Sequence, residues 1–466
     1  MTAKRRPALV LTPGPLEARA FAGQCRAAGL EPVIGCPSAT ARAVRAHRAV
    51  AVVGHCAPHD PITRPGDVLV ATEVETPSGP VPLPAAPLVA SSLARAGARV
   101  LQEPLYGPDG DTAKLVRAAA RAGKPLAVVH VVGDPATDLR TDRALRRARR
   151  VLATWAAATG PRTVLLAEPR SFCAGVERAI EVVERALDRY GPPVYVRRQI
   201  IHNSHVVADL ESRGAVFVDE VEQAPAGARL VFSAHGVSPA VEAAAERRGQ
   251  TVIDATCPLV AKVHHEVRRF AKRDYSVVLV GHAHHDEVEG TMGERADIRL
   301  VSTPEDARTI DVADPERVAY VTQTTLALDD VAEVVDALRD RFPGLVGPRA
   351  DDVCYATQNR QDAVRAIAGD CDLLLVAGSA NSSNSNRLVE VANRAGCVAH
   401  LVDDVGDVDL AWLAGAATVG VTAGASAPPW VVDRLVQALG GLGPVEVETR
   451  TVTEETVRFS LPEAVC

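Results

Sequence analysis

The chain has 466 residues, of which 47% are hydrophobic and 23% charged, and its formal net charge is −7. This length allows two to four domains with real cores, and the composition is that of a globular protein, not a disordered one. No segment approaches the roughly 18 uninterrupted apolar residues of a membrane span, and the first ten residues lack the apolar core of a signal peptide. We therefore expect a cytoplasmic protein without a membrane partner.

Charge is unevenly distributed along the chain. Residues 1–160 contain 21 Lys and Arg against 12 Asp and Glu (+9), and the remaining residues contain 30 against 46 (−16). Much of the positive excess lies in RTDRALRRARR, residues 140–150, which we interpret as a solvated helix face or linker. Because no aromatic residues are interleaved with these arginines, we expect no nucleic-acid partner.

Apolar, strand-like runs alternate with amphipathic helical patterns along most of the chain. VVLVGH, VAYVTQ, DLLLVAGS and ATVGVTAG are each followed by a polar turn and a helical pattern. This alternation predicts an α/β fold with parallel sheets, in which ligands collect at the carboxyl ends of the strands.

A break near residues 159–161 predicts two parts, an extension (1–160) and a second region (161–466). The second region begins with its own strand, TVLLAEP, and a helix. We expect these two elements to supply its first lobe, so that a chain starting near Pro161 would fold unaided.

Three of the nine cysteines share a local setting. Cys173, Cys257 and Cys354 each follow a strand or turn and precede a helix, at separations of 84 and 97 residues. A helix N-terminus favours the thiolate, which is the form that binds metal. The pattern indicates three related lobes that each present one thiol to a common centre, although the spacing alone is a weak metal signal.

The other cysteines lack this setting, and an odd number of scattered cysteines without a CxxC pair argues against a disulfide framework or a zinc ribbon. We interpret them as ordinary buried or surface thiols: Cys25, Cys36, Cys56, Cys371, Cys397 and Cys466.

The segment SANSSNSN, residues 379–386, lies between an apolar strand and a helical pattern. One helix cap needs one Ser or Asn, so the segment has more neutral hydrogen-bonding side chains than capping requires. It predicts a ligand with many acceptor oxygens at a helix N-terminus.

Nine motifs, in this order, carry a resemblance to a known family. They are AEPRSFCAGVERAI, VYVRRQIIHNSHVV, FSAHGVS, DATCPLVAKVH, GHAHHDEVEGTMG, VTQTTL, DDVCYATQNRQ, GSANSSNSNRL and GVTAGASAP. Over about residues 161–466 the chain resembles the 4-hydroxy-3-methylbut-2-enyl diphosphate reductase (LytB) family, iron–sulfur enzymes of the last step of the methylerythritol phosphate route to isoprenoids. The resemblance implies three pseudo-symmetric α/β lobes around one 4Fe-4S cluster, held by Cys173, Cys257 and Cys354 with one iron left open for substrate.

The resemblance also implies the substrate residues and their roles. Glu287 would donate a proton, relayed through Thr324 or the diphosphate, and we expect its pKa to be raised by the nearby anionic diphosphate. Ser426 and Thr324 taken singly could be ordinary caps, His235 a satisfied core histidine, and Glu289 fits a surface acid better than Glu287 does. The diphosphate contacts would be His202, His235, His285, Thr324, Ser382, Ser383, Asn384 and Ser426.

Histidines beside a phosphate can supply positive charge. No flavin or nicotinamide fingerprint is present, so the electrons would come from ferredoxin or flavodoxin, the family's usual donors. The two products would be isopentenyl and dimethylallyl diphosphate. Two other classes of protein stay open, an aconitase-type dehydratase, which needs no electrons, and a non-catalytic iron–sulfur sensor, which needs no proton donor.

The chain departs from the family pattern at three positions. Ser171 stands in SFC where GFC is commoner, Asp286 stands where a proline commonly precedes the acid, and Ala380 stands where a lysine is common. These departures leave the three cysteines intact and bear on the rate and on the geometry of the substrate loop.

The extension carries a second resemblance, to the nucleoside phosphorylase and nucleosidase superfamily. It rests on LTPGPLEARAF, VVGHCAPHDPITRPGDVLVATEV and GKPLAVVHVVGDPATDL. The chain has no equivalent of that superfamily's Met-Glu-Ser ribose-binding segment. We therefore interpret the extension as a non-catalytic α/β domain that serves stability, docking or regulation.

Overall fold

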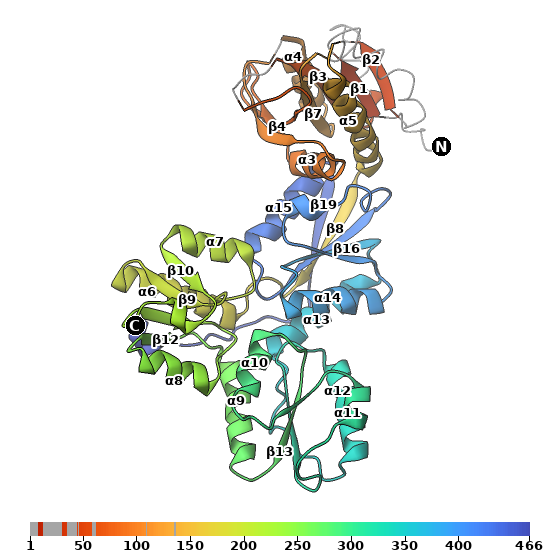
Figure 1. Cartoon of the computed structure of the whole chain (residues 1–466). Helices are drawn as coiled ribbons and strands as arrows, with labels where there is room; N and C mark the ends of the chain where they lie inside the picture. Colours follow the sequence, from red (N-terminus) through yellow and green to blue (C-terminus); the bar gives the residue numbers. More distant parts are fainter. Residues whose placement is uncertain are drawn as a thin grey trace.

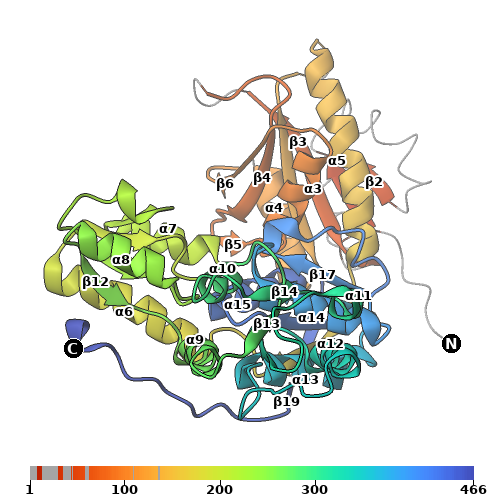
Figure 2. The same cartoon turned by 60° about the horizontal axis from the view of Figure 1, so that its bottom comes forward.

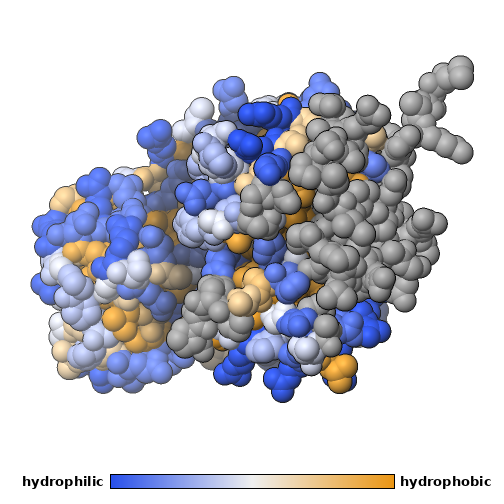
Figure 3. Space-filling view, turned by 90° about the horizontal axis from the view of Figure 1, so that it is seen from above, coloured by the Kyte–Doolittle hydropathy of each residue, from blue (hydrophilic) through white to orange (hydrophobic). Residues whose placement is uncertain are grey.

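The computed structural model describes residues 8–12, 30–34, 44, 46–57, 62–108, 110–134 and 137–466. Cys25, Cys36 and most of the LTPGPLEARAF motif fall outside the described residues. Within the described part of the chain, none of the helices combines the length and apolarity needed to span a bilayer. Seen from above, hydrophilic residues are interspersed with smaller hydrophobic groups over the coloured surface (Figure 3).

The extension forms a mixed sheet with helices beside it (Figure 1). Its strand order is β2-β1-β3-β7-β4-β5, with β6 paired to β4, and β4 runs antiparallel to both β7 and β5. The strands are β1 (Ala8–Thr12), β2 (Leu30–Ile34), β3 (Val50–Cys56), β4 (Val68–Val74), β5 (Val81–Pro82), β6 (Val100–Leu105) and β7 (Leu126–Val132). The helices are α3 (Ala86–Arg95), α4 (Gly110–Arg121) and α5 (Leu139–Ala158).

Helix α5 contains the arginine-rich segment. Asp138 caps it by accepting a hydrogen bond from the N–H of Arg140, 2.8 Å. An apolar stripe that includes the fully buried Trp155 faces the core, and the arginines lie on the other side, half-buried or exposed. This arrangement is that of a solvated helix face, as the sequence predicts.

Three lobes with all-parallel sheets follow the extension. The first lobe has the strand order β10-β9-β11-β12, the second β14-β13-β15 and the third β17-β16-β18-β8-β19. This confirms the predicted α/β class with parallel sheets.

The bounds of the elements are as follows. The first lobe contains β9 (Val194–Arg197), β10 (Ala215–Val218), β11 (Arg229–Phe232), β12 (Thr251–Asp254), α6 (Ala174–Tyr190), α7 (Ser204–Ser212) and α8 (Pro239–Arg247). The second contains β13 (Ser276–Val280), β14 (Arg299–Val301), β15 (Val318–Thr322), α9 (Pro258–Ala271), α10 (Asp286–Met292), α11 (Pro304–Thr309) and α12 (Leu328–Arg341). The third contains β8 (Arg162–Glu168), β16 (Leu373–Ala377), β17 (Ala399–Val402), β18 (Thr418–Ala423), β19 (Val445–Thr451), α13 (Tyr355–Ala368), α14 (Ser383–Arg394) and α15 (Pro429–Gly440).

Strand β8 corrects one expectation. It does not belong to the first lobe with α6, because it lies between β18 and β19 in the third lobe's sheet. Residues 164–167 of β8 are buried, so the strand needs neighbours on both edges and cover on both faces. Only strands from the far end of the chain supply these neighbours, and proximity in sequence does not reveal them.

The extension joins the third lobe through an apolar contact. Helix α3 lies beside α15 (Figure 1) and also packs on the short 3-10 helix η3 (Val405–Asp407). One hydrophobic core runs from the extension's sheet into the third lobe. The backbones come close, because a Cβ placed on Gly441 would lie 2.5 Å from the backbone N of Ala85. We keep the division into 1–160 and 161–466 as a proposal, since a shared core crosses it.

The C-terminal tail, residues 452–466, runs back from β19 to the first lobe (Figure 2). There the Tyr190 hydroxyl donates to the carbonyl of Ala464 (2.6 Å), and Arg178 Nε donates to that of Ser460 (2.8 Å). The tail thereby brings Phe459 to the cavity between the lobes.

Candidate active site

Each of the three predicted cysteines stands where the chain crosses from one lobe to the next. Cys173 lies between β8 of the third lobe and α6 of the first, Cys257 between β12 of the first and α9 of the second, and Cys354 between the second lobe and α13 of the third. All three are helix N-cap residues. Three crossings between lobes therefore place three thiols at the centre of the molecule.

The thiols have room for a shared group. A Cβ placed on Gly175 would lie 2.7 Å from the Sγ of Cys257 and 3.9 Å from the Sγ of Cys173, so glycine leaves the space beside both thiols clear. Cys354 Sγ accepts a hydrogen bond from the N–H of Thr357, 3.3 Å. Thiols are the usual ligands of iron–sulfur clusters, and the residues present fit one.

Burial, and not the helix N-terminus, dominates the thiol pKa values. Burial is the main cause that raises the pKa of Cys257 to about 11 and that of Cys354 to about 12, and neighbouring thiols act in the same direction. The N–H groups at the helix starts do lower the pKa of both thiols, as expected, but burial outweighs them. A bound cation stabilises thiolates directly and would reverse the direction.

All the predicted site residues line one cavity, to which each of the three lobes contributes. They are Cys173, Cys257, Cys354, His202, His235, His285, Glu287, Thr324, Ser382, Ser383, Asn384 and Ser426. The other described cysteines lie elsewhere: Cys371 and Cys397 pack in the core of the third lobe, Cys56 lies in the extension and Cys466 is exposed at the C-terminus.

The polar residues between β16 and α14 form a hydrogen-bonded group at the start of the helix. Ser382 is the N-cap of α14, and its Oγ accepts hydrogen bonds from the hydroxyls of Ser426 (3.2 Å) and Ser385 (3.0 Å). Asn384 Oδ1 accepts from the N–H of Ala425, 2.9 Å. The hydroxyls and free N–H groups at this helix start make a site for an anion.

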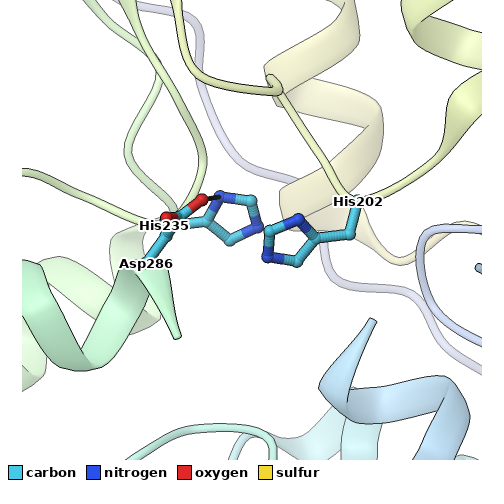
Figure 4. Close-up of side chains that lie close together, drawn as sticks. All are labelled: His202, His235 and Asp286. Atoms are coloured by element: carbon cyan, nitrogen blue, oxygen red, sulfur yellow. Dashed lines mark ion pairs between the residues drawn. The ribbon is translucent and has the colours of Figure 1, made fainter. Parts of the chain in front are cut away.

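Three histidines face this group across the cavity. His202 and His235 stack with ring centroids 4.0 Å apart and an interplanar angle of 18°, and His285 stands edge-on to His202 at 5.2 Å. Figure 4 shows the His202 and His235 rings side by side, with Asp286 beyond His235.

Burial favours the neutral form of all three rings. Burial lowers the pKa of His202 and of His235, and it lowers that of His285 to about 4. His285 Nδ1 also accepts a hydrogen bond from the N–H of Glu287 (3.2 Å), which an imidazolium could not do. The histidines therefore offer N–H donors first, and positive charge only if an anion raises their pKa values.

Glu287 is buried at the start of α10, with 3% of its surface exposed. The N–H of Thr324 donates to its Oε1 (2.6 Å) and the Thr324 hydroxyl donates to Oε2 (3.0 Å). Burial raises the pKa of Glu287 to about 7, although both bonds from Thr324 lower it. The pKa of Glu287 is raised, as expected, but burial raises it without a neighbouring diphosphate.

Two departures from the family pattern have a structural context. Asp286 forms an ion pair with Arg198, which also pairs with the half-exposed Glu289 at 2.7 Å, so a cation offsets the extra negative charge beside Glu287. Ser171 has a φ of 61°, in the left-handed region that favours glycine, which explains why glycine is commoner there.

Sequence reasoning missed several residues that line the cavity. Thr325 donates to Ser383 Oγ (3.0 Å), and its signal is its place beside Thr324. Tyr355 and Thr357 follow Cys354 directly and could have been found from that motif. Phe459 comes from the tail, which carries no sequence signal of its own.

Three thiols and a buried acid at the meeting point of three α/β lobes fit an iron–sulfur enzyme. Residues 164–440 match the LytB protein family. The chain belongs to this family.

Relatives and solved structures agree with this assignment. The chain is 57% identical over 301 residues to a 4-hydroxy-3-methylbut-2-enyl diphosphate reductase of Bordetella pertussis (64% of this chain, 93% of the relative) and 55% identical over 314 residues to one of Mycobacterium tuberculosis (66% and 95%). The structure of E-1-hydroxy-2-methyl-but-2-enyl-4-diphosphate reductase from Plasmodium falciparum has a TM-score of 0.63 at 36% identity, covering 66% of this chain and 97% of that one. About a third of this chain has no counterpart in these proteins.

A futalosine hydrolase of Helicobacter pylori has a TM-score of 0.25 at 9% identity and covers 32% of this chain. A similarity this low supports no conclusion about function. The relation of the extension to nucleosidases stays a prediction.

Proposed function

We propose that this chain catalyses the two-electron reductive dehydroxylation of 4-hydroxy-3-methylbut-2-enyl diphosphate to isopentenyl and dimethylallyl diphosphate. One observation carries the proposal: three thiols, a buried carboxyl with a pKa of about 7 and a hydrogen-bonding helix start converge on one cavity. The relatives that match this chain over nearly their whole length bear the name of this activity.

The diphosphate would bind at the start of α14. Ser382, Ser383 and Asn384 present hydroxyl and amide groups there, and Ser426 lies against Ser382. His202, His235 and His285 face them, and a bound diphosphate would raise their pKa values and draw protons onto them. The charge of the ligand would thus produce the positive charge that it needs.

Cys173, Cys257 and Cys354 would hold one 4Fe-4S cluster as thiolates. When bound, this cluster supplies electrons to the substrate and an open iron as a Lewis acid for its hydroxyl oxygen. The cavity surrounds the thiols with apolar side chains, among them Val176, Leu259 and Phe459, which keep water away from the reacting centre.

Glu287 would supply the proton that lets the hydroxyl group leave as water. Its carboxyl group is half protonated near pH 7 and is hydrogen-bonded to the Thr324 hydroxyl, so a proton can pass from Glu287 through Thr324 to the leaving oxygen. The C–O bond breaks, two electrons enter, and a second proton is added at one of two carbons, which gives the two products.

The electron donor in this proposal is ferredoxin or flavodoxin. A cytoplasmic location is part of the same proposal.

The test uses the protein purified without oxygen. We expect iron and sulfide in the protein, and substrate-dependent oxidation of a reduced one-electron dye with formation of both diphosphate products. Turnover without any reductant would point to a dehydratase, and a cluster without turnover would point to a sensor. Cys173→Ser, Cys257→Ser and Cys354→Ser should each abolish turnover and weaken cluster retention, whereas Cys371→Ser and Cys397→Ser serve as matched controls.

A further inference from the structure

The turn before Cys173 is held in an unfavourable backbone conformation. Ser171, two residues before the thiol, has a φ of 61°, and its buried Oγ has no hydrogen-bond partner. A residue other than glycine rarely adopts this backbone conformation without support from its surroundings. Something in the structure must therefore hold this turn.

Arg360 is the side chain that supports it, beside two 3.3 Å backbone hydrogen bonds, from the Ser171 N–H to the carbonyl of Ala423 and from the Cys173 N–H to that of Ala425. It lies on α13, six residues after Cys354, and its side chain is completely buried. Its Nε and Nη2 both donate to the carbonyl of Ser171, at 3.0 and 2.7 Å, and Nη2 also donates to the carbonyl of Phe172, at 3.2 Å. One guanidinium thus fixes the two residues that precede Cys173.

The same guanidinium also contacts the first turn of α13 and the C-terminal tail. Its Nη1 donates to the carbonyl of Ala356 (2.9 Å), in the first turn of the helix that Cys354 caps. Glu455 of the C-terminal tail pairs with Nη1 at 2.9 Å and with Nη2 at 3.3 Å, and the Asn359 amide donates to Glu455 at 3.0 Å. A buried guanidinium needs such a partner, because an unpaired buried charge is costly.

We propose that Arg360 is a positioning residue that fixes Cys173 relative to Cys354 by holding the strained Ser171 turn, and that Glu455 keeps the guanidinium in place. The inference rests on the proposed function, since it concerns the thiols that would hold the cluster. Its effect is on the placement of a ligand, and Arg360 itself does not line the cavity.

The planar fork of arginine is essential to this role. Arg360 serves three carbonyls and one carboxylate at once, and a lysine ammonium has neither the reach nor the geometry to replace it. A glycine at position 171 would need less support, because glycine adopts positive φ at little cost. The two residues should therefore depend on each other.

The experiment measures cluster retention in the full chain, without substrate. Wild type, Arg360→Lys, Glu455→Gln, Ser171→Gly and the double variant Ser171→Gly/Arg360→Lys are loaded with iron and sulfide, and loss of the cluster to an iron chelator is followed by absorption. Loss of outer partners of a metal ligand commonly costs about 10- to 100-fold in metal affinity, so we expect Arg360→Lys to lose its cluster at least about tenfold faster than wild type. Glu455→Gln should change the rate in the same direction by less.

The double variant separates positioning from general stability. We expect Ser171→Gly to restore retention in the Arg360→Lys background to within about threefold of wild type, about 0.7 kcal/mol. Arg365→Lys, on the same helix but part-exposed and paired with Asp329 and Asp362, is the matched control and should retain the cluster as wild type does. If Arg360→Lys does not fold, Glu455→Gln and its double variant with Ser171→Gly carry the test.

Three results would overturn the proposal. Wild-type retention in both Arg360→Lys and Glu455→Gln would do so, as would faster loss that Ser171→Gly does not slow. A wild type that assembles no cluster at all would overturn the proposed function together with this inference, whereas the first two results leave the proposed function standing.

Discussion

The extension and the three lobes are joined to their neighbours in different ways. The extension meets the third lobe mainly through a shared hydrophobic core and a close backbone contact at Gly441, beside which Arg95 donates to the carbonyls of Gly406 and Val408. The lobes meet one another through charged and polar pairs: Arg198 with Asp286 and Glu289, Arg387 with Asp330, and Ser204 with Asp403 at 2.7 Å. Apolar contacts are lost only at the full cost of exposing them to water, whereas water can solvate separated polar partners.

The difference between polar and apolar contacts matches the role of each interface. A cavity between lobes must admit an anionic substrate, and polar joints can open without exposing a core. The Bordetella pertussis relative matches 64% of this chain, and the extension covers an apolar face of the third lobe. We infer that the polar contacts between the lobes serve the chemistry, whereas the apolar contact between the extension and the third lobe serves stability. The following changes test this inference.

The largest effect should come from Glu287→Gln. It removes the proposed proton donor at the polar centre while keeping its shape, so we expect turnover to fall about 100-fold or more. The melting temperature should not fall, because no apolar contact is lost. Steady-state kinetics and thermal unfolding check this, with Glu289→Gln as the matched control. A Glu287→Gln enzyme within about threefold of wild type would assign the proton to another group.

Removal of the extension should destabilise the rest of the chain. A chain starting at Pro161 exposes the face of α15 and η3 that α3 covers, and each large apolar side chain uncovered costs about 1.5–3 kcal/mol. This revises the expectation that such a chain would fold unaided. Calorimetry and binding of a hydrophobic dye measure the effect. A truncated chain as stable as the full one would show that the shared core contributes little.

Gly441→Ala should weaken the same joint without deleting anything. The added Cβ would lie 2.5 Å from the backbone N of Ala85, so the extension must shift. We expect the free energy of unfolding to fall by about 1–3 kcal/mol, as for other overpacked cores, with turnover per folded molecule unchanged. Gly440→Ala is the control, because a Cβ there meets no atom within 4 Å. Equal stability of the two variants would contradict a close apolar joint.

The smallest effect should be a pH dependence that belongs to the polar centre. The pKa of Glu287 is raised from 4.5 to about 7, so its proton is lost as the pH rises through 7, and kcat/KM should fall about tenfold between pH 6 and 8. Stability follows the same direction, because the contribution of the neutral carboxyl is complete below 4.5 and is lost as the pH rises through about 7.

Glu287→Gln is the control for this pH dependence, because the substrate titrates in the same way with this variant but the Glu287 carboxyl is absent. Both pH dependences should disappear in it. If kcat/KM of Glu287→Gln still fell between pH 6 and 8 as in wild type, the fall would belong to titration of the substrate.

The sequence predicted much of the site because motifs are local. Cys173, Cys257 and Cys354 each precede a helix in the sequence, and each caps one in the structure. The dense run at residues 379–386 likewise marks one helix start. Short motifs carry such positions because the strand end, the turn and the helix lie within a few residues of one another.

The features of the fold and site that the sequence does not predict depend on contacts between distant segments. The support of Ser171 comes from Arg360 and, through it, from Glu455, which lie 189 and 284 residues away, and no local pattern connects them. The pKa of Glu287 follows from burial between lobes, and a sequence motif does not state burial. The local sequence does not predict the place of β8 for the same reason, because its neighbours are strands from the end of the chain.

The place of β8 also sets an order of events during synthesis. The strand pairs with β18 and β19, so the third lobe's sheet cannot close until residues 445–451 have left the ribosome. The chain of the first two lobes emerges in between, and long-range pairing of this kind is slow. Until the last strands arrive, the newly made protein exposes β8, together with the apolar side of the extension that later packs on α15. Chaperones would therefore meet this chain with that surface open.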